Sequence, residues 1–254
     1  MVATSPSQAA TFALSEGQLV FTNFSQSPWG TFTDTHTNTG AIFQGGNVKA
    51  SADAQATFKV LSPEALNSSL SLAEGMNNDY LGLAETQAKL IGNFSIVAGK
   101  SFSFDFRTLG NLKTSINDSS KEEAKANGDI FWVLIDKDHN NKTLDFFNIK
   151  GNLFTESDGD FLKINQSKNV AITNQRIKSN FGGKEEFATV LVEGSLKRVF
   201  ANTTNLALVE VNTSQVVVKA PEPSVNVALL ISSGVIGIVL KRKRKVNIST
   251  CSLK

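Results

Sequence analysis

The chain has 254 residues and a formal net charge of +2 at pH 7, and without the basic block at 241–245 this charge falls to −3. The sequence contains no other cluster of basic residues, which argues against a protein that binds nucleic acid. The single cysteine, Cys251, excludes an internal disulfide and a thiolate metal cage.

The first ten residues, MVATSPSQAA, are small and polar. They resemble the end of a secretory signal peptide, with an A-x-A-like site around Ser7-Gln8-Ala9, although a charged region and an apolar region do not precede it. Two interpretations stay open for residues 1–10: the remnant of a signal peptide, or a disordered N-terminus.

Residues 11–218 are predicted to form one domain made of β-strands. The clearest strand lies within residues 93–109, where Phe102, Phe104 and Phe106 fall on one face and polar residues fall on the other. Further strands are predicted within residues 11–25, 128–136, 143–154, 188–200 and 205–220, and turns at residues 98–100, 137–142 and 156–160.

One helix is predicted at residues 62–75, because Ser62 is a good N-cap, Pro63 suits the first helical position and Gly75 suits a C-cap. Residues 119–128 fit either a helical turn or a charged loop. Many strands with short turns predict an all-β fold, an antiparallel β-sandwich of jelly-roll type with one or two short helices.

The turn at "DKDHNN" has oxygen-bearing side chains at alternate positions, Asp136, Asp138 and Asn140, as at the start of a calcium loop. A calcium loop of this kind needs Gly at position six and an acid at position twelve, and this sequence has Asn and Phe there. A plain hairpin turn is the favoured interpretation, and a weak calcium site is the alternative. Asp158 and Asp160 would contribute to it if the two hairpin ends met.

Nothing in the sequence points to catalysis. His36 lies in the polar, threonine-rich stretch "TDTHTNTG" and is predicted to be a solvated loop residue rather than a general base. The acids that lie close in sequence, such as Glu185 and Glu186, give no sign of flanking a cleft. We therefore expect a protein that is not an enzyme and that needs no cofactor, calcium apart.

Three aromatic residues are candidates for stacking against a sugar: Trp29, Tyr80 and Trp132. Trp132 lies in an apolar strand and is expected in the core. Trp29 therefore carries the hypothesis of a carbohydrate-binding surface.

The C-terminal part changes character. Sixteen residues without a charge, 225–240, would span about 24 Å as a helix, somewhat less than a hydrocarbon core of about 30 Å. A basic block follows, and its long side chains extend the span by snorkelling: Lys241, Arg242, Lys243, Arg244 and Lys245. The positive-inside bias places this block and the tail 246–254 in the cytoplasm, and therefore the body outside it.

A Pro-Glu-Pro motif, Pro221, Glu222 and Pro223, precedes this run. The two prolines hold the segment extended, either as a rigid spacer or as a peptide that a processing enzyme grips. In this order, "APEPS", the apolar run and "KRKRK" resemble the PEP-CTERM sorting signal of exported proteins in Gram-negative bacteria, here over residues 219–245.

The resemblance implies a partner and a location. A membrane-embedded transpeptidase, exosortase, would recognise Pro221, Glu222 and Pro223 while residues 225–240 anchor the protein transiently in the inner membrane. The mature form would lie at the cell surface or outside the cell. The body, by "FSIVAGKSFSFDF" and "GDIFWVLID", resembles the variable domains that precede such tails in cyanobacteria. The expected function is that of an exported cell-surface or extracellular-matrix protein of structural or interaction type. The alternative is a β-sandwich module that binds exopolysaccharide.

Overall fold

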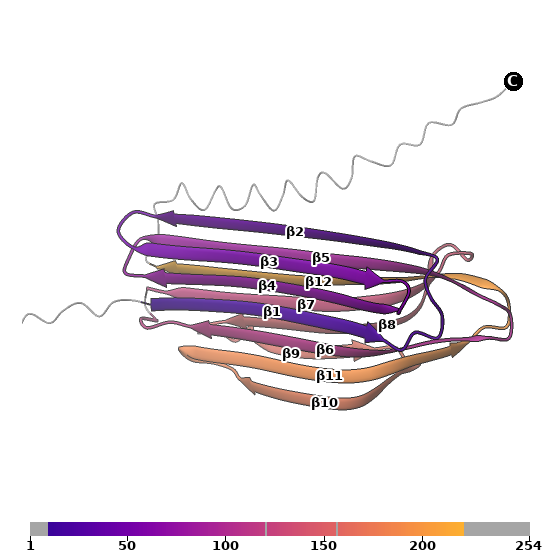
Figure 1. The fold of residues 1–254 in the computed structure, drawn as a ribbon. Coiled ribbons are helices and arrows are strands. Elements are labelled where there is room, and N and C mark those ends of the chain that lie inside the picture. The colour runs from indigo at the N-terminus through magenta and orange to yellow at the C-terminus, as the bar shows by residue number, and fades with distance from the viewer. Residues whose placement is uncertain (1–9, 120, 156, 221–254) are drawn as a thin grey trace, which may run out of the picture. The chain divides into compact units, whose positions relative to one another are not determined.

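The computed structural model describes residues 10–119, 121–155 and 157–220, which form twelve β-strands (Figure 1). Every pairing between them is antiparallel, so the predicted all-β antiparallel fold is confirmed. The strands are β1 (Ala10–Thr22), β2 (Gly30–Phe43), β3 (Asn47–Lys59), β4 (Glu64–Met76), β5 (Tyr80–Ile96), β6 (Ser101–Ser115), β7 (Glu123–Asp136), β8 (Lys142–Phe154), β9 (Phe161–Gln166), β10 (Val170–Asn180), β11 (Glu185–Val199) and β12 (Thr204–Ala220).

The strands form two six-stranded sheets. Sheet A has the order β10-β11-β6-β1-β4-β3, and sheet B has the order β2-β5-β12-β7-β8-β9. The arrangement is a β-sandwich with more strands than the eight of a jelly roll. In Figure 1, β2 forms the upper edge of the sandwich and β10 the lower edge.

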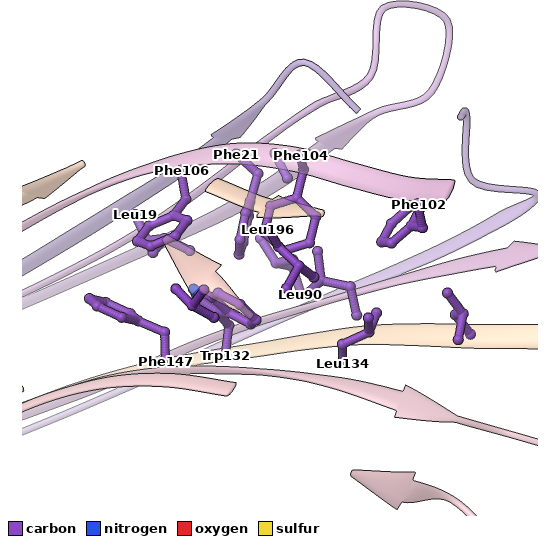
Figure 2. Packing of buried hydrophobic residues seen from close by; sticks show 14 of the residues in the cluster. Leu19, Phe21, Leu90, Phe102, Phe104, Phe106, Trp132, Leu134, Phe147 and Leu196 are labelled. Carbon is purple, nitrogen blue, oxygen red and sulfur yellow. The ribbon is translucent and has the colours of Figure 1, made fainter. Parts of the chain in front are cut away.

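One half of the interior is aromatic. Phe102, Phe104 and Phe106 of β6 are at most 3% exposed, as their alternation predicted. They face Trp132 and Phe147 of sheet B, and Figure 2 shows these side chains pointing toward one another from the two sheets. The Phe104 and Trp132 ring centroids lie 5.2 Å apart in an edge-to-face arrangement, which adds to the stabilisation from burial.

The other half of the interior is built from small residues, chiefly alanine and valine. Here the sheets approach closely, because a Cβ atom added at Gly82 of β5 would lie 2.6 Å from Val48 of β3. A Cβ atom at Gly75 would fall within the Tyr80 ring. The sandwich therefore changes from large side chains to small ones along its length.

The helix predicted at residues 62–75 is wrong, because this segment is β4. The residues that β4 buries are small or polar, among them Asn67, Ser69 and Ser71, and they hydrogen-bond within the interior. Buried residues alternate along β4, but because these residues are small or polar, a search for alternating apolar residues does not detect the strand. No helix occurs in the described part of the chain, so the one or two predicted short helices are not found there. Residues 123–128 belong to strand β7 rather than to a helical turn.

Several predictions fall on residues outside the described part. They concern residues 1–9, the Pro-Glu-Pro motif, the apolar run 225–240, the basic block 241–245 and the tail 246–254. Among the described residues there is no helix that could span a bilayer.

Candidate functional site

The predicted calcium turn joins β7 to β8. The Asp136 carboxylate lies at the end of β7, is 8% exposed and accepts hydrogen bonds from the backbone N–H groups of Asp138 (3.0 Å) and His139 (3.2 Å). Asp138 instead turns to β12, where it accepts hydrogen bonds from the backbone and side chain of Asn205 at 2.7 and 3.0 Å. These bonds lower the pKa of Asp138.

The turn has the geometry of a tight hairpin. Asn140 and Asn141 have positive φ angles of 54° and 55°, a conformation that asparagine tolerates well. The Asp136 carboxylate thus closes the turn and the Asp138 carboxylate binds Asn205 of β12, and calcium binding at Asp136, Asp138 and Asn140 stays a prediction.

Asp158 and Asp160 do not join this turn. They lie between β8 and β9, whereas the calcium turn lies before β8, so the length of β8 separates them. A thirteen-residue strand spans about 40 Å. The described residues contain no group of three or more His, Cys, Asp or Glu side chains placed to hold a metal.

Trp29 precedes β2 and is 65% exposed, in agreement with its choice as a surface aromatic. Its backbone N–H donates to the Asn93 carbonyl oxygen at 2.9 Å, which fixes the position of the residue. The Lys137 ammonium lies 5.3 Å from the ring centroid and donates to Asn93 Oδ1 at 3.1 Å. The ring thus forms a cation–π contact with Lys137.

The other two aromatic candidates lie in the core. Trp132 is fully buried, as expected from its strand. Tyr80 is fully buried as well, and this corrects its choice as a surface residue. Its ring occupies the space that Gly75 leaves open, and burial raises its pKa.

A layer of polar side chains crosses the interior between the aromatic half and the small-residue half. Ser69 donates to Asn212 Oδ1 at 2.7 Å and lies 2.7 Å from the Ser214 hydroxyl, while Ser71 donates to the Ser214 carbonyl oxygen at 3.1 Å. The Asn67 amide donates to the Glu210 carboxyl group. This polar layer joins β4 to β12 through the middle of the sandwich.

Glu210 is the most unusual member of this layer. It is fully buried, and the desolvation of its carboxylate raises its pKa well above 4.5. Beside the layer, a cavity at Gly17 and Asn212 leaves about 20 Å³ for the centres of water molecules. That is room for about one water, whereas a small-molecule site needs roughly 300 Å³.

Two acids that the sequence did not predict to meet, Glu186 and Asp160, lie next to each other. Glu186 at the start of β11 is 2% exposed, accepts hydrogen bonds from Thr114 (2.9 Å) and the Gly182 N–H (3.1 Å), and lies next to Asp160. Burial and, after it, the hydrogen bond and charge of Asp160 raise the pKa of Glu186 to about 7. Asp160 lies between β8 and β9 and Glu186 lies 26 residues later at the start of β11, so no local sequence pattern predicts their contact.

The outer face of sheet B carries a shallow hollow over β12, β7, β8 and β9. Phe131 and Phe146, both half-buried, supply its apolar part. Its polar part includes Asp129, which accepts a hydrogen bond from the Asn148 amide, and Lys150. Desolvation raises the pKa of Asp129, with the Asn148 bond and the Lys150 charge opposing the rise. Sequence analysis did not single out these residues.

We call this surface the sheet-B hollow: Asp129, Phe131, Phe146, Asn148, Lys150, Asn165, Val211 and Thr213.

Comparison of the chain with models of known families, with curated proteins and with solved structures gives no match.

Proposed function

We propose that this chain is an exported cell-surface or extracellular-matrix protein of structural or interaction type. The observation that carries the proposal is the order of three sequence features: Pro221-Glu222-Pro223, the uncharged run 225–240 and the basic block 241–245. The order suits recognition of an extended peptide beside a membrane anchor whose basic end stays in the cytoplasm. In this proposal an exosortase-type transpeptidase processes the tail, and the sandwich acts outside the cell.

The test is the intact mass of the exported protein. The chain is produced behind a functional export signal in hosts with and without exosortase. We expect a product that ends near residues 220–223 only in the host with the enzyme. Triple replacement of Pro221, Glu222 and Pro223 by alanine should abolish that product, whereas triple replacement of Asn247, Ser249 and Thr250, beyond the basic block, should not. Retention of Lys254 in both hosts would contradict the proposal.

The sheet-B hollow supports a second function, binding of an extracellular polysaccharide. Half-buried phenyl rings beside amide, carboxylate and ammonium groups offer the mixture that sugar rings require, apolar faces and directed hydrogen bonds. Trp29 is the second candidate surface, although Lys137 lies over its ring.

Glycan-array binding with two variants separates these surfaces. If the sheet-B hollow binds the polysaccharide, Phe131→Ala should reduce binding at least tenfold and Trp29→Ala should leave it unchanged. The reverse result would assign binding to Trp29. A wild-type protein that binds no glycan on the array would count against this second function and leave the first one standing.

A further inference from the structure

Strand β2 is exposed on both of its faces along almost its whole length. Twelve of its fourteen residues are exposed, and the other two are half-buried glycines. The large apolar side chains Phe32, Ile42 and Phe43 are 52%, 38% and 57% exposed. It pairs with β5 alone and forms the edge of sheet B (Figure 1). β3 of the opposite sheet lies close to β2, yet nearly all residues of β2 remain exposed.

The hydrogen-bonding groups on that open edge belong to the threonines. The Gln44 N–H donates to the Asp79 carbonyl oxygen at 2.9 Å, one step beyond the regular β2–β5 register. In an antiparallel ladder the residues that bond to a given neighbour alternate. Even-numbered residues of β2 therefore bond to β5. The odd-numbered residues, Thr31, Thr33, Thr35, Thr37 and Thr39, direct their N–H and C=O groups to the open edge.

The other three edges are protected in ways that natural sheets use against pairing. β10 has a register shift at Ile172/Asn174 and carries Arg176 and Lys178. β9 is only six residues long, and β3 carries lysines at positions 49 and 59. β2 has fourteen residues in unbroken register and contains no lysine, arginine or proline.

The charges of β2 favour a second copy of the same strand as the partner. Asp34 is its only acid and His36 its only basic residue. When two β2 strands run antiparallel with Thr35 opposite Thr35, Asp34 of each copy lies opposite His36 of the other. Thr33 then faces Thr37, and Thr31 faces Thr39. Threonine pairs stabilise sheets across strands, and a carboxylate can accept a hydrogen bond from an imidazole N–H.

The same register also satisfies the backbone. Odd-numbered residues meet odd-numbered residues, so the free N–H and C=O groups pair with each other. Asp34 and His36 then form non-hydrogen-bonded pairs, in which side chains approach most closely. On β5, Lys89 lies opposite Asp34 and Gln87 opposite His36, so no second acid lies directly across from Asp34 within the chain.

We propose that β2 is a self-association edge: it pairs antiparallel with β2 of a second copy, centred on Thr35, and joins two six-stranded sheets into one. The interface is isologous, so it closes after two copies. This inference does not depend on the tail or on export.

The first test is the mass of the full chain in mild detergent, by sedimentation and by light scattering over a concentration series. The wild type should approach twice the monomer mass. Thr35→Pro removes an N–H of the open edge and no bond to β5, so it should give the monomer mass. Thr35→Val, the matched control, keeps the N–H and should stay dimeric. Association that survives Thr35→Pro, or a monomeric wild type, would overturn the proposal; the former result would point to the tail.

The second test fixes the register and does not require Thr35→Pro to fold. In a Cys251→Ser background, Thr35→Cys should form an intermolecular disulfide on mild oxidation, since Cα atoms of such a pair lie about 5.5 Å apart. Thr33→Cys should not, because its counterpart lies four residues away, about 13 Å. Equal cross-linking at both positions would reject the register.

The charge pair has its own test. Asp34→His alone should weaken association at least fivefold, and the exchange Asp34→His with His36→Asp should restore it, because a carboxylate again lies opposite an imidazole. An exchanged variant as weak as the single one would contradict the Asp34–His36 pairing.

Discussion

Replacement of Glu210 by glutamine should change how stability depends on pH. Glu210 is fully buried in the polar layer, and burial raises its pKa well above the 4.5 of an exposed glutamate. Below pH 4.5 the carboxyl group is protonated in both the folded and the unfolded chain. Above pH 4.5 the unfolded chain releases this proton while the folded chain retains it. Stability therefore falls as pH rises, until the pH reaches the folded-state pKa.

The magnitude follows from linkage. One group that keeps its proton in the folded state costs up to about 1.4 kcal/mol of stability for each pH unit. Over two units above pH 5, this amounts to as much as about 2.7 kcal/mol. Glu210→Gln is neutral at every pH and nearly the same shape, so its stability relative to wild type should rise with pH above 4.5, by up to this amount between pH 5 and pH 7.

Urea unfolding of both proteins at several pH values measures the effect. Glu16→Gln is the matched control, because it makes the same change on the half-exposed outer face of β1 rather than in the interior. Parallel pH profiles for wild type and Glu210→Gln would refute the reasoning, since they would mean that Glu210 ionises equally in the folded and unfolded chains. Glu186, whose pKa is raised to about 7, contributes a similar slope between pH 4.5 and 7 that both proteins share.

Three further substitutions and one control substitution test side-chain packing and an ion pair by urea unfolding at pH 7. Phe104→Ala should lower the free energy of unfolding by about 3–5 kcal/mol, because it removes a ring from the centre of the aromatic half. Gly17→Ala should lower it by about 1–3 kcal/mol, since the new Cβ would lie 2.4 Å from the side chain of a buried asparagine, whereas Gly40→Ala, with 3.9 Å to its nearest neighbour, should have little effect. Arg198→Met should cost about 1–3 kcal/mol, because it leaves the fully buried Asp145 carboxylate without its ion pair at 2.9 Å; no loss in any of the three would contradict the corresponding contact.

Apolar alternation and turn chemistry predicted the strands that line the aromatic half. Phe102, Phe104 and Phe106 each face the core, and the apolar run at residues 128–136 is the inner part of β7, between β12 and β8. The turn before β6 was also predictable, since Gly99 has a positive φ of 76°. At these positions the polarity of each side chain indicates whether it faces the core or the solvent.

The strands that the sequence did not reveal are those without apolar alternation. β4 buries serine and asparagine, whose burial is stable only because β12 supplies hydrogen-bond partners. Those partners lie about 140 residues further along the chain. Such a strand is specified by long-range contacts. The local helix-start signal at Ser62 and helix-stop signal at Gly75 therefore led to a wrong prediction.

The candidate sites divide in the same way. The exposure of Trp29 and the turn at residues 137–142 follow from local composition, and both were predictable. The raised pKa of Glu210, the meeting of Glu186 with Asp160 and the sheet-B hollow depend on strand order and register. No spacing within the sequence contains that information.

The prediction for the stretch around His36 was wrong: it was expected to be a loop, and it is part of β2, a strand of fourteen residues. It buries little apolar area, so the interior of its own domain does not explain why threonine recurs at every second position. An edge that must pair does explain it: threonine favours the extended conformation, and each one stands where the backbone has an open donor and acceptor. The regularity of β2 is thus a requirement of a partner strand rather than of a core, and a search based on burial overlooks strands of this kind.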